Sequence, residues 1–257
     1  MVPLAGTICF IGKDEYMGYV LLAPAVWMLA VYAAAALLPA IVLLRYIYRH
    51  DHIEKEPPAL LIRLLLGGVL SAFAAILLET VGMWILPMIA AEDSVLYHVL
   101  FAFLVVAVSE EGAKLFFLKK YSWHQPAFNY MFDGIVYAVF VSLGFAAFEN
   151  VKYVFDYGLS VAFSRAFLAV PAHMAFAVFM GIFYGRARWH AHRGNNAMAK
   201  SSMAAGFISA VLLHGFYDAC LMVGTNLSLI AFVGFVIFMY FFVSRVVKTA
   251  AKGDHPL

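Results

Sequence analysis

The chain has 257 residues, of which 65% are hydrophobic and only 12% are charged, and its mean hydropathy is +0.90. A water-soluble domain of this length needs a much larger polar surface, so this composition excludes one and indicates a protein that crosses a membrane several times. The formal net charge of +2 is small. We expect the lipid bilayer, and no nucleic acid, as the partner of the chain.

Seven apolar runs are each long enough to cross the roughly 30 Å of a bilayer's hydrocarbon layer. We therefore predict an all-α, polytopic bundle of about seven transmembrane helices, forming a single integral membrane domain over residues 1–257. The second run is long and contains Glu79, Gly82 and Pro87, so we expect it to be tilted, kinked or partly interfacial. The runs are 17–44, 59–90, 95–118, 133–157, 161–185, 203–224 and 226–247.

Basic residues are unevenly distributed over the segments that join these runs. Twelve of them lie in alternate joining segments or after the last run, whereas the opposite side holds only Lys13 if Arg165 is counted within the fifth run. The positive-inside rule therefore places the N-terminus outside and the C-terminus inside. The twelve are Arg45, Arg49, Lys55, Lys119, Lys120, Arg186, Arg188, Arg193, Lys200, Arg245, Lys248 and Lys252.

The N-terminal segment MVPLAGTICFIGKDE lacks a basic start and an obvious cleavage site. We therefore do not expect a removed signal peptide. The two cysteines, Cys9 and Cys220, are too few for a disulfide framework or a four-ligand zinc site, although a single bridge between them stays open.

Ionisable residues inside the predicted helices are the main functional signal. A charge at the centre of such a helix costs about 3 kcal/mol on insertion scales, so these residues normally face a bundle interior or a water-filled cavity. A single one is often only a contact between helices, but a set at similar depth favours a shared site. The set is Glu79, Glu110, Glu111, Lys114, Glu149, Lys152, His173, His214 and Asp218.

The spacing of the third-run residues brings two carboxylates to one lysine. Glu110 and Lys114 are four residues apart on one helix face, and Glu111 is three residues from the same lysine. Lys114 can therefore hold and neutralise the pair. Two close carboxylates do not both ionise easily, so one of them is available as a base.

Each candidate histidine lies on a stripe of small residues. His214 has Asp218 four residues later, a carboxylate that can orient its ring. Small residues at four-residue steps let helices approach closely, so these stripes turn the histidines toward other helices. They are His214 with Ala210 and Gly206, and His173 with Ala177, Gly181 and Gly185.

Depth along the runs predicts that the polar groups converge. Glu110, Glu111, His173 and His214 fall in one layer near the membrane centre, with Glu149 and Asp218 somewhat outward. Such a set is enough to activate water and stabilise a transition state, and it is also enough to bind a metal. The usual zinc-protease, serine-protease, aspartyl membrane-protease and nucleotide-binding motifs do not occur in the sequence.

Four ordered blocks resemble the PrsW family of intramembrane proteases, part of the wider group that contains the CAAX-prenyl proteases and related bacterial Abi-type membrane proteins. The blocks are EEGAK at 110–114, GFAAFENVKY at 144–153, His173 in RAFLAVPAHMAFAVFMG, and HGFYD at 214–218. DHIEKEPP at 51–58 also looks like the family's cytoplasmic loop. The resemblance covers about residues 51–218, and no motif position departs from the pattern.

The resemblance implies peptide-bond hydrolysis in a bacterial cytoplasmic (inner) membrane. Its implied partners are single-span membrane proteins, notably anti-sigma factors that are cleaved during envelope stress signalling. The substrate does not follow from fold and site, and the oligomeric state stays open.

As a hypothesis, Glu110 or Glu111 is the base that activates water, and His173 assists it. His214, oriented by Asp218, polarises the scissile carbonyl or stabilises the oxyanion. Glu149 completes the catalytic set as a further polar member of the cavity. The supporting residues are Tyr153 and Asn150 beside it, and Lys114, whose role is structural.

Three alternatives stay open. Zinc, held by residues drawn from Glu110, Glu111, His173, His214 and Asp218, would leave one position for water; we favour a site without a cofactor because no established zinc spacing is present. A proton-coupled transporter also needs buried carboxylates and histidines, although neither internal repeats nor paired broken helices are found. A non-catalytic scaffold or sensor explains the small-residue stripes but not the convergent ionisable residues.

Overall fold

The computed structural model describes residues 13–257, so Cys9 and the bridge considered for it lie outside the described residues. The described elements are all helices, apart from one isolated bridge between Tyr130 and Pro256, and this confirms the all-α prediction. The helices are α1 (Lys13–His50), α2 (Pro58–Ile85), the 3₁₀ turn η1 (Leu86–Met88), α3 (Val95–Leu100), the π-helix η2 (Phe101–Ala107), α4 (Val108–Ser122), α5 (Asp133–Tyr157), α6 (Leu159–Phe167), α7 (Ala169–His192), α8 (Asn196–Val223) and α9 (Asn226–Lys252).

Six helical segments are long and apolar enough to span a membrane. They are Val26–His50, Pro58–Met88, Asp133–Tyr157, Leu159–His192, Asn196–Val223 and Asn226–Lys252. The predicted run 95–118 corresponds to α3, η2 and α4 in succession, and its second half carries the charged residues of EEGAK. A polytopic membrane bundle is therefore confirmed, while the count of seven and the orientation stay predictions.

Two predicted runs are interrupted, and each interruption lies near a proline. The 59–90 run ends in η1, which contains Pro87. The 161–185 run divides into α6 and α7 at Leu168, three residues before Pro171. Proline has no N–H to donate to the carbonyl four residues earlier, so the carbonyl of Phe167 receives no helical hydrogen bond from residue 171. The Tyr240 hydroxyl of α9 donates a hydrogen bond to that carbonyl.

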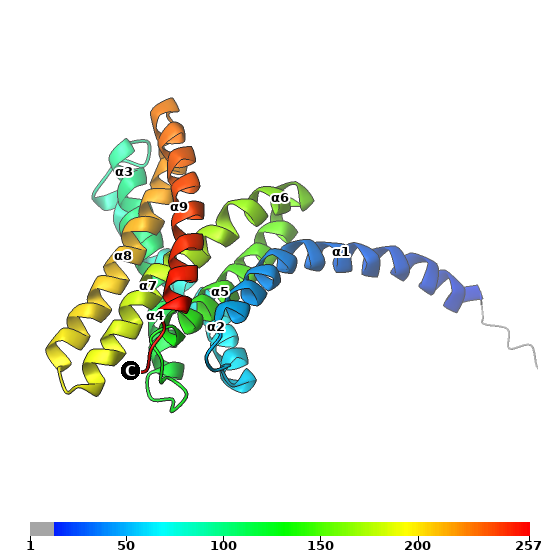
Figure 1. The fold of residues 1–257 in the computed structure, drawn as a ribbon. Helices are drawn as coiled ribbons and strands as arrows, with labels where there is room; N and C mark the ends of the chain where they lie inside the picture. The colour runs from blue at the N-terminus through cyan, green and yellow to red at the C-terminus, as the bar shows by residue number, and fades with distance from the viewer. Residues whose placement is uncertain (1–12) are drawn as a thin grey trace, which may run out of the picture.

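α5 lies at the centre of the bundle, between α2 and α7, whereas the N-terminal part of α1 extends away from the other helices (Figure 1). Glycines permit the central contacts. A Cβ added to Gly134 would lie 2.6 Å from the backbone nitrogen of Gly185, and one added to Gly181 would lie 2.5 Å from Cα of Ile135. These distances leave no room for a side chain, so the small-residue stripe of α7 packs directly on α5 as predicted.

The loop between α1 and α2 contributes a buried acid at one end of α5. Glu56 is almost fully buried, and its Oε2 accepts a hydrogen bond of 2.5 Å from the Tyr137 hydroxyl. Burial, followed by the charge of Asp133, raises the pKa of Glu56 to about 9. Two acids of the segment DHIEKEPP, Asp51 and Glu56, are therefore packed into the fold, so the segment is not only a polar turn.

Candidate active site

α4 begins two residues before the EEGAK block and follows directly on the π-helix η2. π-helical segments are rare and are frequent at functional sites. On the facing helix α8, Gly215 lies against this segment, because a Cβ there would be 2.6 Å from Cγ of Phe103. A glycine next to His214 thus lets α8 approach the segment that leads into Glu110 and Glu111.

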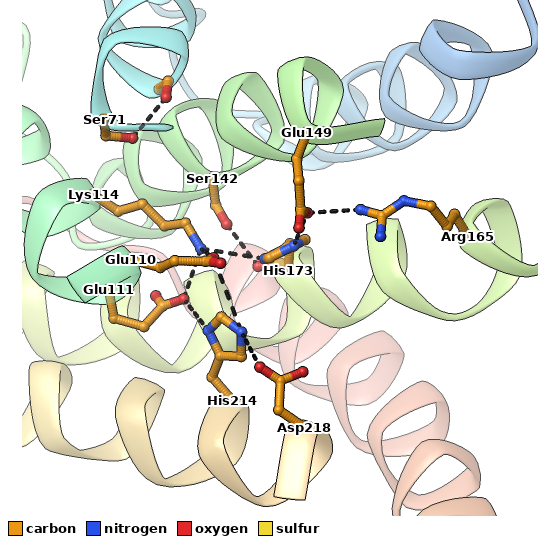
Figure 2. Close-up of polar contacts among 11 residues, drawn as sticks. Ser71, Glu110, Glu111, Lys114, Ser142, Glu149, Arg165, His173, His214 and Asp218 are labelled. Atoms are coloured by element: carbon orange, nitrogen blue, oxygen red, sulfur yellow. Dashed lines mark hydrogen bonds and ion pairs between the residues drawn. The ribbon is translucent and has the colours of Figure 1, made fainter. Parts of the chain in front are cut away.

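Lys114 joins three of the predicted site residues (Figure 2). Its Nζ donates to Glu110 Oε2 at 3.0 Å and to Glu111 Oε1 at 2.8 Å, and it lies 3.2 Å from His173 Nδ1. The ammonium also lies 4.0 Å from the centre of the Phe145 ring. Lys114 is only 2% exposed, so it is a buried cation that compensates the two carboxylates. The contact with both acids confirms the grouping expected from the spacing.

His214 lies between acids on both sides of its ring. Nδ1 is 2.9 Å from Glu111 Oε1, and Nε2 is 3.2 Å from Asp218 Oδ2 and 3.9 Å from Glu110 Oε2. A ring with both N–H groups donating satisfies this arrangement. Phe176 stacks on the imidazole at 4.9 Å between ring centres. The predicted contact of Asp218 with His214 is therefore present, and the ring is held on its edges and on one face.

His173 is held by Lys114 on one side and by Glu149 on the other. A lysine ammonium only donates, so Nδ1 accepts from Lys114 and Nε2–H donates to Glu149 Oε2 at 3.0 Å. The backbone carbonyl of His173 accepts a hydrogen bond of 2.8 Å from Ser142 Oγ on α5. These contacts fix one tautomer of His173 and join α4, α5 and α7 at the site (Figure 2).

Arg165 of α6 is a site residue that the sequence analysis did not identify. Its Nη2 donates to Glu149 Oε2 at 2.7 Å and its Nε donates to Asn150 Oδ1 at 2.9 Å. The guanidinium also lies 4.0 Å from the centre of the Tyr153 ring. Tyr153 and Asn150 therefore act on Glu149 through Arg165, while Asn150 also donates to the carbonyl of Ala36 in α1. The sequence signal that could have identified Arg165 was its position, since it is an arginine inside an apolar run.

A cavity of about 530 Å³ opens beside these residues. Glu110 lines it, whereas Glu111 and Lys114 do not; Glu111 is 1% exposed and lies behind Glu110. Glu79, named in the sequence for its depth but given no role, also lines the cavity. The acids, histidines and arginine of the lining come from six helices and are Glu79, Glu110, Glu149, Arg165, His173, His214 and Asp218.

Four residues converge closely enough to bind a metal ion. Donor atoms of Glu110, Glu111, His173 and His214 all lie within 4.8 Å of one another, whereas Asp218 is not part of this group and contacts His214 instead. Two carboxylates and two imidazoles suit zinc. Glu111 Oε2 is buried without a hydrogen-bond partner and so has a lone pair available. The residues fit a divalent ion, but Lys114 Nζ contacts three of the four and would have to withdraw.

The comparison with known families bears on the choice between a protease, a transporter and a scaffold. Residues 56–245 match the family described as PrsW family intramembrane metalloprotease. The chain belongs to the PrsW family. The match includes α9, so it extends beyond the motif-bearing region of 51–218. PrsW membership supports a membrane protease over the transporter and scaffold alternatives.

Relatives named "Protease PrsW" match most of the chain. The relative from Geobacillus kaustophilus (strain HTA426) is 35% identical over 72% of this chain and 77% of its own length. The relative from Oceanobacillus iheyensis is 34% identical over 77% of this chain and 86% of its own length. The relative from Bacillus subtilis (strain 168) is 31% identical, with coverages of 84% and 94%. No solved structure matches the chain.

Proposed function

We propose that this PrsW-family protein is an intramembrane endopeptidase of a bacterial cytoplasmic membrane that cuts single-span, membrane-anchored proteins, anti-sigma factors among them. The observation that carries the proposal is the cavity between membrane-spanning helices, where Glu110, His173 and His214 meet. These are a carboxylate and two imidazoles, the groups that most often move protons in hydrolysis.

Glu110 is the base in this proposal. It lines the cavity, whereas Glu111 is held behind it by Lys114 and His214. Glu110 takes a proton from water as the water oxygen bonds to the scissile carbonyl carbon. The proton then passes to the amide nitrogen as the C–N bond breaks, which leaves a carboxylate and an amine. Glu111 is a positioning residue that holds Lys114 and His214.

His214 stabilises the oxyanion that forms when water attacks. Its ring, whose two N–H groups donate to Glu111 and Asp218, carries a positive charge beside the cavity, and preorganised charge in a site with little water is worth about 3 kcal/mol to the transition state. His173 holds the attacking water when its Nδ1 exchanges Lys114 for that water, while the contact of Nε2 with Glu149 keeps the ring in place. Arg165 keeps Glu149 in place.

Zinc dependence is the second candidate form of this function, and two observations favour it: the family's description as metalloproteases and the four converging donors. Glu110, Glu111, His173 and His214 would hold the ion. When bound, zinc would polarise the carbonyl and make water acidic enough to ionise near neutral pH. Lys114 at the centre of the same donors supports the form without a cofactor that the sequence favours.

The test is cleavage of tagged single-span reporters by purified protein in proteoliposomes. We expect Glu110→Gln to lower the cleavage rate by about 1000-fold, since a positioned general base contributes about 10²–10⁴-fold. Glu92→Gln, at an exposed acid outside the cavity, is the matched control and should cleave at the wild-type rate. Equal rates for all three proteins would remove Glu110 from the mechanism.

The same assay separates the two forms of the site. Activity that survives a strong chelator, with no zinc found by elemental analysis, supports the metal-free form. Activity that is lost to the chelator and returns with added zinc supports the zinc form. Absence of cleavage across a reporter panel that includes anti-sigma factors would contradict the proposed function itself.

A further inference from the structure

A second, apolar cavity lies beside the candidate active site. It is a groove of about 220 Å³ between α1, α7 and α9, separate from the cluster of acids and histidines. We call it the α1–α9 groove. Its walls include Leu43 and Tyr46 of α1, Pro171 and Ala175 of α7, and Val236 and Met239 of α9.

The α1–α9 groove adjoins the active-site cavity. Leu168, Ala172 and Tyr217 line both. Ala172 directly precedes His173 in the chain and presents only a methyl group. Leu168 is the residue at which α6 and α7 separate. A segment lying in the groove therefore has the groups of the active site immediately beyond a thin, irregular boundary.

The α9 wall of the groove is long enough and apolar enough for a transmembrane helix to pack alongside it. On α9 its lining runs from Phe235 to Lys248, which corresponds to about 20 Å of helix at 1.5 Å per residue. The α7 side presents Ala172 and Ala175, and small residues let a second helix approach closely within a bilayer. About 13 residues of a partner helix fit alongside.

Two of the groove's three walls, α1 and α9, are the least enclosed membrane-spanning helices of the described bundle. Only 11% of the apolar windows of α1 and of α9 is buried. Phe238 and Phe241 of α9 are exposed. Because these helices are apolar and exposed along the membrane-spanning length, an occupant enters the groove sideways from the bilayer.

The two cavities extend toward opposite ends of the bundle. The groove reaches Lys248, near the end of α9, whereas the active-site cavity reaches Phe101, Ser164 and Met222, at the end where α8 turns into α9. The Tyr240–Phe167 hydrogen bond crosses from α9 to the α6–α7 junction where the two cavities meet. A bound helix would lie in one half of the membrane and its cleaved segment in the other.

We propose that the α1–α9 groove binds the transmembrane helix of the substrate and delivers its adjoining segment past Leu168 and Ala172 to the active site. The lateral entrance of this route lies between α1 and α9. The proposal deepens the proposed protease function and rests on it for the cleavage step, but helix binding in the groove can be measured without cleavage.

The binding test is photo-crosslinking to a tagged single-span reporter with an apolar Leu/Ala segment of about 20 residues. Val236→benzoylphenylalanine lies in the groove, and Ile237→benzoylphenylalanine, the neighbouring residue, is 53% exposed on α9 and does not line the groove. Both are placed in the Glu110→Gln background in proteoliposomes. We expect a reporter adduct from position 236 at least about tenfold stronger than from position 237. Equal adducts, or lipid adducts alone at position 236, would overturn the proposal.

The cleavage test uses the same two positions in the otherwise wild-type chain. We expect Val236→Trp to lower reporter cleavage by about tenfold or more by filling the groove, and Ile237→Trp to leave the rate within about twofold. If Val236→Trp cleaves normally, the groove is not the entry route. If Val236→Trp fails to fold, the crosslinking result decides. A reporter that crosslinks at position 236 but is not cut by the wild type upholds the groove and contradicts the proposed function.

Discussion

α5 and α9 both span the membrane, yet they differ in almost every other respect. The apolar window of α5 is 78% buried and that of α9 is 11% buried. α5 carries Ser142, Glu149 and Asn150 into the polar network, whereas α9 presents mainly apolar side chains to its surroundings. The site is therefore built on enclosed helices, which fix its geometry, while the proposed entry route runs along the loosely packed α1 and α9.

The largest expected effect is the loss of stability when a buried charge is removed, compared with the removal of an exposed charge. Lys114→Met removes a cation that compensates two buried carboxylates, so we expect a loss of about 3–5 kcal/mol in the free energy of unfolding and loss of cleavage. Lys152→Met on α5 breaks only the exposed pair with Asp156 and should cost less than about 1 kcal/mol. Denaturant titration in detergent micelles measures both.

If Lys114→Met is as stable as Lys152→Met, the carboxylates of α4 have another counter-charge. Elemental analysis of the Lys114→Met protein would show whether that counter-charge is a bound metal ion. Such a result would also move the balance toward the zinc form of the site.

The second contrast is between a glycine packed closely against another helix and a glycine with open space around it. Gly134→Ala adds a methyl group 2.6 Å from the backbone nitrogen of Gly185, and overpacking of this kind costs about 1–3 kcal/mol. Gly234→Ala on α9 meets no atom within 4 Å and gains helix propensity, so the free energy of unfolding should not fall. Thermal unfolding of the two variants checks the sign of each change. Equal losses would mean that α9 is also closely packed, against another molecule.

A smaller effect is expected from Arg165→Lys. Lysine keeps the charge but cannot contact Glu149 and Asn150 through two fixed nitrogens, so Glu149 and then His173 become less well positioned. We expect kcat/KM for the reporter to fall about tenfold, which corresponds to about 1.4 kcal/mol. Lys152→Arg, on the exposed side of α5, is the control. A wild-type rate for Arg165→Lys would show that charge alone is required.

Much of the candidate site follows from local spacing in the sequence. Glu110, Glu111 and Lys114 meet because residues three and four apart share a helix face, and His214 meets Asp218 for the same reason. That α4 and α8 then face each other was predicted only from depth and from stripes of small residues. The argument from depth depends on the free-energy cost of inserting a charge into the membrane, which is large for every such residue.

The parts that were not predicted depend on contacts between distant segments. Arg165 was counted for topology, because nothing in its own neighbourhood shows that Glu149 lies beside it. The break at Leu168 results from Pro171 together with a hydroxyl from α9 that satisfies the freed carbonyl. The π-helix before Glu110 has no local sequence signal, since it reflects how α8 packs at Gly215.

The smallest effect concerns the far end of α5, where Glu56 packs against Tyr137. Burial raises the pKa of Glu56 to about 9 from an ordinary value of 4.5, so between these pH values the folded state binds a proton that the unfolded state has lost. The contribution of Glu56 to stability is therefore present below about pH 4.5 and is lost as pH rises toward 9.

Glu56→Gln keeps an acceptor for Tyr137 without this titration. We expect its melting temperature to exceed that of the wild type by on the order of 3 °C at pH 8.5, with the difference shrinking toward pH 5. Asp51 in the same loop has its pKa raised to about 6 by burial, so both proteins retain its pH dependence, and their difference reports on Glu56 together with the neighbouring Asp133, whose charge acts on it. A difference that grows toward low pH would mean that Glu56 is charged in the folded protein and that this end of α5 is less enclosed than the site end.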